Sequence, residues 1–374
     1  MSTTKERKKC IFCNFDLHIK LFENDLETFA GHYAVEKNTI NYQSIPYNVL
    51  ICDNCNTAQL KYLADLNEVY KINHADGTGN TMMKLHQLNK KLVLKHKEKI
   101  NNIIEIGSSK GIFADLLLDE INMQYYIIEP NFIGNSNKKI IVNDFYENVN
   151  DNEIDANTIF MSHVFEHFYE PFSILEKIYN NTKIKNVFLT FPDLENYIEK
   201  NINHVLNTEH TYYIDNKFLI NLFKKFGFCL VEKIKFKGHS VLFYFERRYK
   251  KKIKPINFKN SKNKLKKFFK TIISTTNKIN DFVNKYNNIY LWPASVHTLM
   301  LCTFGLQYQK IKGLLDNSEL KINKKMYGMN TEIFPFSHIL NKKNKAIIIL
   351  NGGVFNKEIK KQIKSKNIKI ITYN

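Results

Sequence analysis

Four of the six cysteines stand in two pairs that have the spacing of metal ligands. Cys10 and Cys13 form one C-x2-C knuckle, and Cys52 and Cys55 form a second one after 38 intervening residues. Two-residue spacing lets both thiolates of a knuckle face one tetrahedral ion, and two knuckles complete a four-sulfur zinc site. Because that shell leaves no open coordination position, we predict zinc with a structural role. Ordinary buried cysteines are the alternative, whereas a redox centre needs only one of the two pairs.

A glycine-bearing turn follows an apolar run at residues 103–111, IIEIGSSKG. Gly107 and Gly111 permit a sharp turn and a close approach of the backbone to a ligand, because glycine has no Cβ. Glu105 precedes the turn and suits the positively charged end of S-adenosylmethionine (SAM), and Ser108 lies within the turn. The pattern alone also fits other nucleotides or a plain turn, but it lacks the G-K-[ST] of a phosphate-binding P-loop.

The next predicted strands end in groups that suit the rest of SAM. Glu129 follows YYII about twenty residues after the glycine turn, where a Rossmann-like site places a carboxylate on the ribose hydroxyls. Asp144 and Phe145 follow the next apolar run and suit the amine and the ring of adenine. His163 ends a fourth run and is predicted to line the methyl-donor pocket, since ligands bind at the carboxyl ends of parallel strands.

A polar and aromatic cluster, NTEHTYY, occupies residues 207–213 between two apolar segments. Histidine is the side chain best matched to proton transfer near neutral pH, and an adjacent carboxylate can orient it or raise its basicity. His210 is therefore a candidate base with Glu209 beside it, although the residues alone leave a structural role open. His167, directly after Glu166, is equally open to a helix-capping or packing role.

The elements that must position these groups are short apolar runs that alternate with helical periodicity from residue 99 onward. They read NIIEIG, FADLLLDEI, YYIIEP, KKIIVNDF, NTIFMSHVFEH, FSILEKIYNN and NVFLTFP, and a second alternating stretch reads NIYLW, IKGLL, AIIIL and IKIITYN. Such alternation indicates βαβ units and a parallel sheet. We therefore predict an α/β fold: a doubly wound SAM-methyltransferase sheet with an N-terminal zinc-binding module and a C-terminal Rossmann-like α/β domain.

The length of 374 residues exceeds the size at which a single core stops growing, so several domains are expected. We predict a zinc-binding module at 1–75, a SAM-dependent methyltransferase domain at 76–245, a basic linker at 246–283 and a C-terminal α/β domain at 284–374. The C-terminal domain either holds the nucleotide part of a substrate or serves packing alone. The linker is either a solvated face or a contact for substrate phosphates or RNA.

Lysine and arginine total 55 against 36 aspartate and glutamate residues, a formal charge of +19 that favours anionic partners. Nucleic acid, anionic lipid and a diphosphate-bearing small molecule all qualify by charge, but no recognisable RNA-binding motif is present. The first ten residues precede no apolar segment, and the most apolar later stretch is broken by Pro293, Ser295 and His297. We therefore expect a cytoplasmic protein that is neither secreted nor membrane-spanning.

Over nearly its full length the chain resembles the sugar C-methyltransferases, zinc-containing enzymes that use SAM to methylate C-3 of a nucleotide-linked 4-keto deoxysugar. The resemblance is carried by the first C-x-x-C, ICDNCNTAQL, EIGSSKG, IIEP, TEHTYYID, KGHS, LWPASVHTLML, GLLDNS and YGMNTEIFP. It implies that His210 removes a proton next to the sugar ketone and that the enolate attacks the SAM methyl group, with Glu209 assisting. A ketone-adjacent carbon needs such a base, whereas an alcohol or amine is methylated largely through proximity and orientation.

Two positions depart from this family. Asn207 stands where its members carry a tyrosine, so the acid or enolate-stabilising role is vacant or moves to Tyr212 or Tyr213. Pro293 stands in a C-terminal turn where glycine is usual, which stiffens the loop. The alternatives are therefore an O- or N-methyltransferase acting on a saccharide or related metabolite and, from another class, a zinc-bearing RNA-binding or RNA-modifying protein.

Overall fold

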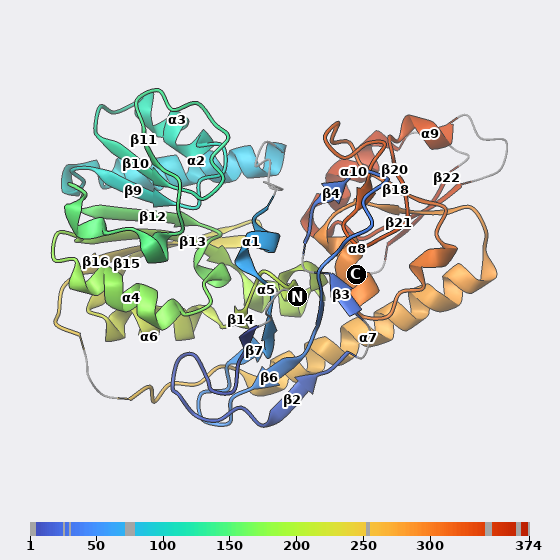
Figure 1. The fold of residues 1–374 in the computed structure, drawn as a ribbon, viewed down its shortest axis with the longest axis horizontal. Coiled ribbons are helices and arrows are strands. Elements are labelled where there is room, and N and C mark those ends of the chain that lie inside the picture. The colour runs from blue at the N-terminus through green and yellow to red at the C-terminus, as the bar shows by residue number, and fades with distance from the viewer. Residues whose placement is uncertain are drawn as a thin grey trace.

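The computed structural model describes residues 5–24, 27–29, 31–71, 79–251, 255–340, 346–363 and 368–372. Its three largest sheets have seven, five and four strands. Figure 1 shows the seven-stranded sheet on the left, the five-stranded sheet on the right and the N-terminal segment between and below them. Within the described residues, no helix is long and apolar enough to cross a membrane.

The seven-stranded sheet has the strand order β11-β10-β9-β12-β13-β16-β15. Its first five strands are parallel, and β16 runs antiparallel between β13 and β15. The chain therefore reverses its direction of winding between β9 and β12, which opens a crevice at the carboxyl ends of these strands. This mainly parallel sheet confirms the predicted fold class. The strands are β9 (Ile103–Ile106), β10 (Tyr125–Ile128), β11 (Ile140–Val142), β12 (Thr158–Ser162), β13 (Asn186–Pro192), β15 (Phe228–Phe236) and β16 (Ser240–Arg247).

Helices cover both faces of this sheet, with α2 and α3 above it and α4 and α6 below it in Figure 1. Successive strand residues point to opposite faces, so Ile103 packs with α2 and α3 whereas Ile104 packs with α4 and α6. Both faces are buried, which explains why the strands read as continuous apolar runs. The helices are α2 (Asn80–Lys95), α3 (Ile112–Leu118), α4 (Pro171–Asn180) and α6 (Asn216–Lys225).

The four-stranded sheet joins the N-terminal segment to the centre of the chain. Its order is β14-β7-β6-β2, and all its pairings are antiparallel. The edge strand β14 (Tyr212–Tyr213) follows the predicted catalytic segment and pairs with β7 (Ala58–Leu60). The other strands of this region are β1 (Lys5–Glu6), β2 (Ile19–Phe22), β3 (Glu27–Phe29), β4 (Ala34–Val35), β5 (Ser44–Pro46), β6 (Val49–Ile51) and β8 (Tyr62–Leu63).

The five-stranded C-terminal sheet is parallel throughout and has the order β20-β18-β17-β21-β22. The predicted strands in NIYLW, IKGLL, AIIIL and IKIITYN all lie in it. Its strands are β17 (Ile289–Trp292), β18 (Gly313–Leu315), β20 (Ile333–Phe334), β21 (Ala346–Leu350) and β22 (Ile368–Thr372). Around it lie β19 (Lys325–Met326), α8 (Val296–Thr303), α9 (Ser337–Leu340) and α10 (Asn356–Gln362).

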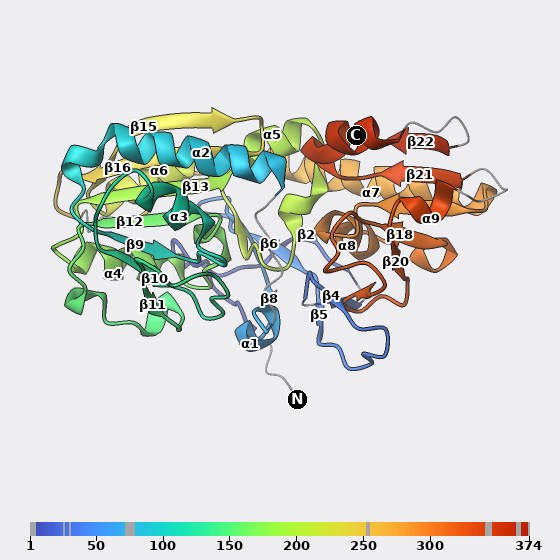
Figure 2. The ribbon, with the colours of Figure 1, turned by 90° about the horizontal axis from the view of Figure 1, so that it is seen from above.

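Much of the segment predicted as a linker forms one long helix, α7 (Lys262–Lys285), which starts behind β2 and β6 and runs toward the C-terminal sheet (Figures 1 and 2). Its apolar stripe is buried: Phe269 packs on Phe22 of β2 and on Phe304 beside α8. Its outer face exposes a row of lysines that includes Lys264, Lys267 and Lys270. Helix α7 therefore binds the N-terminal and C-terminal parts of the chain together.

Candidate functional site

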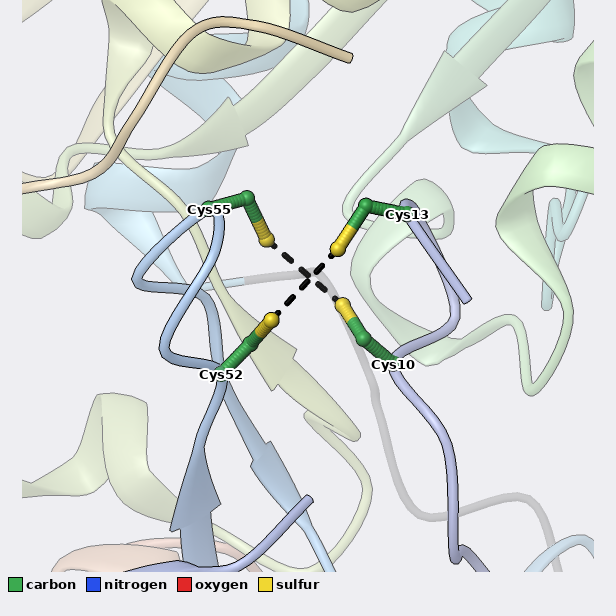
Figure 3. Close-up of side chains that lie close together, drawn as sticks. All are labelled: Cys10, Cys13, Cys52 and Cys55. Atoms are coloured by element: carbon green, nitrogen blue, oxygen red, sulfur yellow. Dashed lines mark hydrogen bonds between the residues drawn. The ribbon is translucent and has the colours of Figure 1, made fainter. Parts of the chain in front are cut away.

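The four cysteines of the two knuckles converge on one point (Figure 3). The Sγ atoms of Cys10 and Cys55 lie 3.5 Å apart, and those of Cys13 and Cys52 lie 3.4 Å apart. A tetrahedral zinc ion with bonds of about 2.3 Å requires sulfur separations of about 3.8 Å, so the four donors need only a small expansion to hold it. The donor set and its geometry therefore fit a structural zinc ion.

Each knuckle turns in the same way, and an asparagine makes the turn possible. Asn14 and Asn56 directly follow the second cysteine of each pair and have φ values of 60° and 57°. Asparagine tolerates this left-handed conformation better than most residues. The N–H of each asparagine donates to the carbonyl of the first cysteine in its knuckle, at 2.9 and 2.8 Å.

The pKa values of two cysteine thiols in the cluster shift in opposite directions. A hydrogen bond from Cys55 lowers the pKa of Cys10 to about 5, which provides a first thiolate. Burial raises the pKa of Cys52 to about 12, because a second negative charge in this cluster is costly without a counter-ion. A divalent metal supplies that counter-ion, so metal binding and full deprotonation are coupled.

Removal of the metal should destabilise the N-terminal module. We expect about one equivalent of zinc in the purified protein, and less than about half an equivalent in Cys52→Ser, because three thiolates cannot close the shell. The thermal midpoint of this variant should fall as well. Metal analysis and thermal denaturation measure both effects, with Cys229→Ser as the matched control outside the cluster. Unchanged zinc in Cys52→Ser would exclude the four-cysteine site.

A cavity of about 410 Å³ lies at the carboxyl ends of the seven-stranded sheet, at the reversal of winding between β9 and β12. Three parts of the chain build its wall. The N-terminal module contributes His32, Leu66 and Tyr70. The C-terminal domain contributes Ser295, Val296 and Lys321. The strand ends and the loops after them contribute Ile106, Gly107, Ser109, Ile128, Glu129, Pro130, Asn131, Asp144, Phe145, Tyr146, Glu147, His163, Val164, His167, Phe168, Tyr169, Asn207 and Glu209.

The glycine turn and the carboxylate of the next strand form one unit on this wall. Glu129 accepts hydrogen bonds from the backbone N–H of Ser109 at 2.9 Å and of Asn131 at 3.2 Å. Gly107 has a φ of 72°, and a Cβ there would lie 2.4 Å from Cγ2 of Val164. The backbone can therefore turn closely beneath the cavity only because this residue lacks a side chain.

Asp144, Phe145 and His163 also lie on the wall, as the sequence predicts for strand ends. Asp144 accepts hydrogen bonds from the N–H of Phe145 and from the amide of Asn148, both at 2.7 Å, which fixes its carboxylate. His163 has a φ of 56°, and its ring bridges Glu166 at 3.1 Å and the hydroxyl of Ser240 at 2.8 Å.

Four predicted site residues lie outside the lining of the cavity: Glu105, Ser108, Gly111 and His210. Glu105 shares the sheet face of Ile103 and accepts a hydrogen bond from the buried hydroxyl of Tyr125 at 2.7 Å. Burial raises the pKa of Glu105 to about 7, although the hydrogen bond from Tyr125 and the charge of Lys139 act in the opposite direction. The carbonyl of Ser108 accepts the N–H of Gly111, which has a φ of 72° and begins helix α3.

Substitution of the turn glycine should weaken SAM binding before it affects the fold. We expect Gly107→Val to raise the dissociation constant of SAM by about tenfold or more, because a left-handed conformation costs about 1–2 kcal/mol without glycine and Val164 blocks the new side chain. Isothermal titration calorimetry measures the loss. Gly79→Val is the control, because a Cβ at Gly79 meets nothing within 4 Å. Equal affinity in both variants would place SAM elsewhere.

Two buried carboxylates organise the histidines beside the cavity. Glu209 is 7% exposed, with Oε1 2.9 Å from Nδ1 of His32 and Oε2 3.6 Å from Nδ1 of His167. The hydroxyl of Tyr70 lies 2.9 Å from the same nitrogen of His167. These side chains come from the N-terminal module and from the methyltransferase region, so the cluster exists only in the assembled fold.

Glu166 is the second carboxylate, and it is 1% exposed. Its carboxylate lies 3.1 Å from His163 and 3.9 Å from Nε2 of His210. Burial acts to raise the pKa of Glu166, but the hydrogen bond and the electrostatic interactions with these histidines outweigh it, so the net shift of the pKa is downward. The ring of His210 packs edge-on against the ring of His167, with the two ring centres 5.0 Å apart. Its Nδ1 lies 2.9 Å from the carbonyl oxygen of Val205, which can only accept, so Nδ1 carries the proton and Nε2 is free to accept one.

Asn207 has a structural task that a tyrosine could not perform in this position. Its side-chain oxygen accepts the N–H groups of Glu209 at 2.9 Å and of His210 at 2.8 Å, forming a turn that presents both residues. Neither Tyr212 nor Tyr213 lines the cavity. Their hydroxyls face the carbonyl of Phe165 and the hydroxyl of Tyr47, respectively. Tyr70 lines the cavity and also contacts the histidine cluster, through the 2.9 Å contact between its hydroxyl and His167.

Neither His32 nor Tyr70 is a site residue in the sequence-based predictions, which also give Glu166 no catalytic role. Tyr70 ends the short helix α1 (Leu66–Val69), which begins at the capping side chain of Asp65. That cap is a local signal for a helix, but no local pattern indicates what Tyr70 faces. His32 lies in a polar stretch without periodicity, and only the long-range packing of that stretch brings it to the cavity.

Comparisons with known proteins identify the central region. Residues 82–233 match the model of a family described as a methyltransferase domain. This range contains the strand ends that form the cavity floor. No curated protein sequence matches the chain.

Several solved structures are similar to this chain. One is 1,6-didemethyltoxoflavin-N1-methyltransferase from Burkholderia thailandensis, with 8% identity over 44% of this chain and 78% of that chain and a TM-score of 0.34. Another is the N-methyltransferase NodS from Bradyrhizobium japonicum, with 11% identity over 46% of this chain and 99% of that chain and a TM-score of 0.33.

Proposed function

We propose that this chain, a SAM-dependent methyltransferase, transfers a methyl group to a carbon atom next to the ketone of a nucleotide-linked sugar. The observation that supports the proposal is a cluster at the wall of the cavity, in which the carboxylates of Glu166 and Glu209 lie beside histidine side chains. Carbon methylation needs a group that removes a proton from carbon, and such a cluster supplies it. Proximity and orientation account for much of O- or N-methylation without it.

SAM would lie against the strand ends. Glu129 suits the ribose hydroxyls, Asp144 and Phe145 suit adenine, and Gly107 allows the backbone to approach the ligand. SAM supplies the methyl group as an electrophilic sulfonium. This arrangement leaves the part of the cavity beside His167 and Glu209 for the methyl acceptor.

His210 is proposed as the general base. Its Nε2 is unprotonated, and the carboxylate of Glu166 at 3.9 Å stabilises the imidazolium that forms when Nε2 accepts the proton. The electron pair of the broken C–H bond forms the enolate, whose carbon then bonds to the methyl group as the methyl–sulfur bond breaks. His167 lines the cavity and His210 does not, so the acceptor would have to approach Nε2 of His210 from the part of the cavity next to His167.

Tyr70 is proposed to stabilise the enolate oxygen, the role left open by Asn207. Tyr70 lines the cavity, and its hydroxyl lies 2.9 Å from Nδ1 of His167. Burial raises the pKa of Tyr70 well above its usual value, so the hydroxyl keeps its proton and can donate it in a hydrogen bond. Donors aimed at a developing oxyanion are among the largest contributions to catalysis.

The C-terminal domain is proposed to hold the nucleotide part of the acceptor. Lys321 lines the cavity, and its ammonium donates to the carbonyl of Ala294 and pairs with Asp316 at 3.2 Å. Ser295 caps helix α8 on the same wall. A fixed ammonium and a helix N-terminus are both suited to a diphosphate.

The proposal is tested by SAM turnover against a panel of nucleotide-linked keto sugars, with the methylated atom located by NMR. We expect His210→Ala to lose about 100-fold or more in kcat, the contribution typical of a general base, while the SAM dissociation constant stays within about twofold. His18→Ala serves as the control, since His18 is an exposed residue of the N-terminal module. Full turnover in His210→Ala would overturn the base assignment, and methylation at oxygen or nitrogen would overturn the carbon target.

The pH dependence gives an independent test of the same base. Burial, reinforced by the neighbouring His167, lowers the pKa of His210 to about 3, whereas an exposed histidine titrates near about 6.5. The neutral imidazole is the active form, so acid inactivates the enzyme only as the pH falls toward the lowered pKa. We therefore expect kcat/KM to show no acidic limb between about pH 5 and pH 8. An acidic limb centred near the ordinary histidine value would contradict this environment for the base.

A further inference from the structure

We propose that His32, a residue of the zinc-bearing N-terminal module, is a positioning residue for Glu209 and, through it, for the His167–Tyr70 pair. The proposal rests on the proposed function of this cavity. It assigns the N-terminal module a direct part in the active site, beyond its task of holding a metal ion.

The contacts of His32 use both nitrogens of its ring. Nδ1 lies 2.9 Å from Oε1 of Glu209, and Nε2 lies 2.9 Å from the hydroxyl oxygen of Thr208. The contact with Glu209 is at ion-pair distance, and the contact with Thr208 is a hydrogen bond between its hydroxyl and the ring. The ring is 6% exposed and lines the cavity. His32 thus contacts both Thr208 and Glu209, the two residues that precede the proposed base His210.

The other side of the His32 segment is held by the C-terminal domain. Strand β4 begins two residues later and pairs with β19, with Ala34 opposite Met326. The N–H of Tyr327 donates to the carbonyl of Tyr33 at 2.9 Å, and the two tyrosine rings lie 5.0 Å apart. His32 is therefore fixed between the C-terminal domain on one side and Glu209 on the other.

This fixation matters because Glu209 is a buried carboxylate. Its two oxygens face different imidazoles, His32 at 2.9 Å and His167 at 3.6 Å. A buried carboxylate that loses a neighbouring imidazole loses part of its electrostatic stabilisation, so its position should change. Loss of the His32 contact should therefore shift the Glu209 carboxylate relative to His167, whose ring contacts the hydroxyl of Tyr70.

The experiment compares three variants of the full-length protein. His32→Phe keeps a ring of similar size without nitrogens, His32→Asn keeps an N–H donor near the position of Nδ1, and His18→Phe changes an exposed histidine of the same module. We expect His32→Phe to lose about 100-fold in kcat, the cost typical of a displaced catalytic group, with the KM of the acceptor and the affinity for SAM changed by about twofold or less. His32→Asn should recover at least about tenfold of that loss.

A second measurement needs no acceptor and separates this proposal from the proposed function. Hydrogen exchange of the Glu209 and His210 amides, which are bonded to Asn207, should accelerate in His32→Phe and return toward the parent rate in His32→Asn. His18→Phe should leave the exchange unchanged. If the parent protein methylates no keto sugar, the proposed function fails. The positioning role is refuted separately if hydrogen exchange in His32→Phe is unchanged, or if His32→Phe and His32→Asn lose kcat equally. Unchanged kcat in His32→Phe with an active parent also refutes it.

Discussion

The pairing of β14 with β7 is the constraint on which the rest of the site depends. Tyr212 stands opposite Gln59 and Tyr213 opposite Ala58, so the chain leaving Glu209 and His210 becomes an edge strand of the cysteine-bearing N-terminal module. Arg7 strengthens the junction, since its guanidinium donates to the backbone carbonyl of Thr211 at 2.6 Å. The four-stranded sheet therefore fixes the candidate active-site segment to the N-terminal module, for which the sequence predicts only a structural role.

From this junction follows the electrostatic character of the cavity wall. Glu166 and Glu209 are both buried, and isolated buried carboxylates would be costly. Each is offset by imidazoles that approach from different parts of the fold: His163 and His210 for Glu166, His32 and His167 for Glu209. Burial nevertheless lowers the pKa of His210 to about 3, so the neutral imidazole is favoured at this position of the cluster.

The sequence predicts what local chemistry determines. The two cysteine knuckles, the parallel strands and the groups at their ends follow from spacing, periodicity and the alternation of side chains, and the structure brings Gly107, Glu129 and Asp144 to one cavity. Glu105 faces away from it, because alternation along β9 places it beside Ile103 and Tyr125. His32 and Tyr70 could not be predicted, since each reaches the cavity only through contacts with residues far away in the chain. The roles of the site residues remain predictions.

The two knuckles also determine how far the intervening chain can move. The chain between Cys13 and Cys52 leaves the cysteine cluster, pairs with β19 through β4 and returns to the cluster, and His32 lies just before β4. A bound ion would tie both ends of this excursion, and a closed loop loses far fewer conformations on docking than an open one. Binding of a cation at the cysteines would therefore lower the entropic cost of placing His32 at the cavity, although the cation and His32 do not touch.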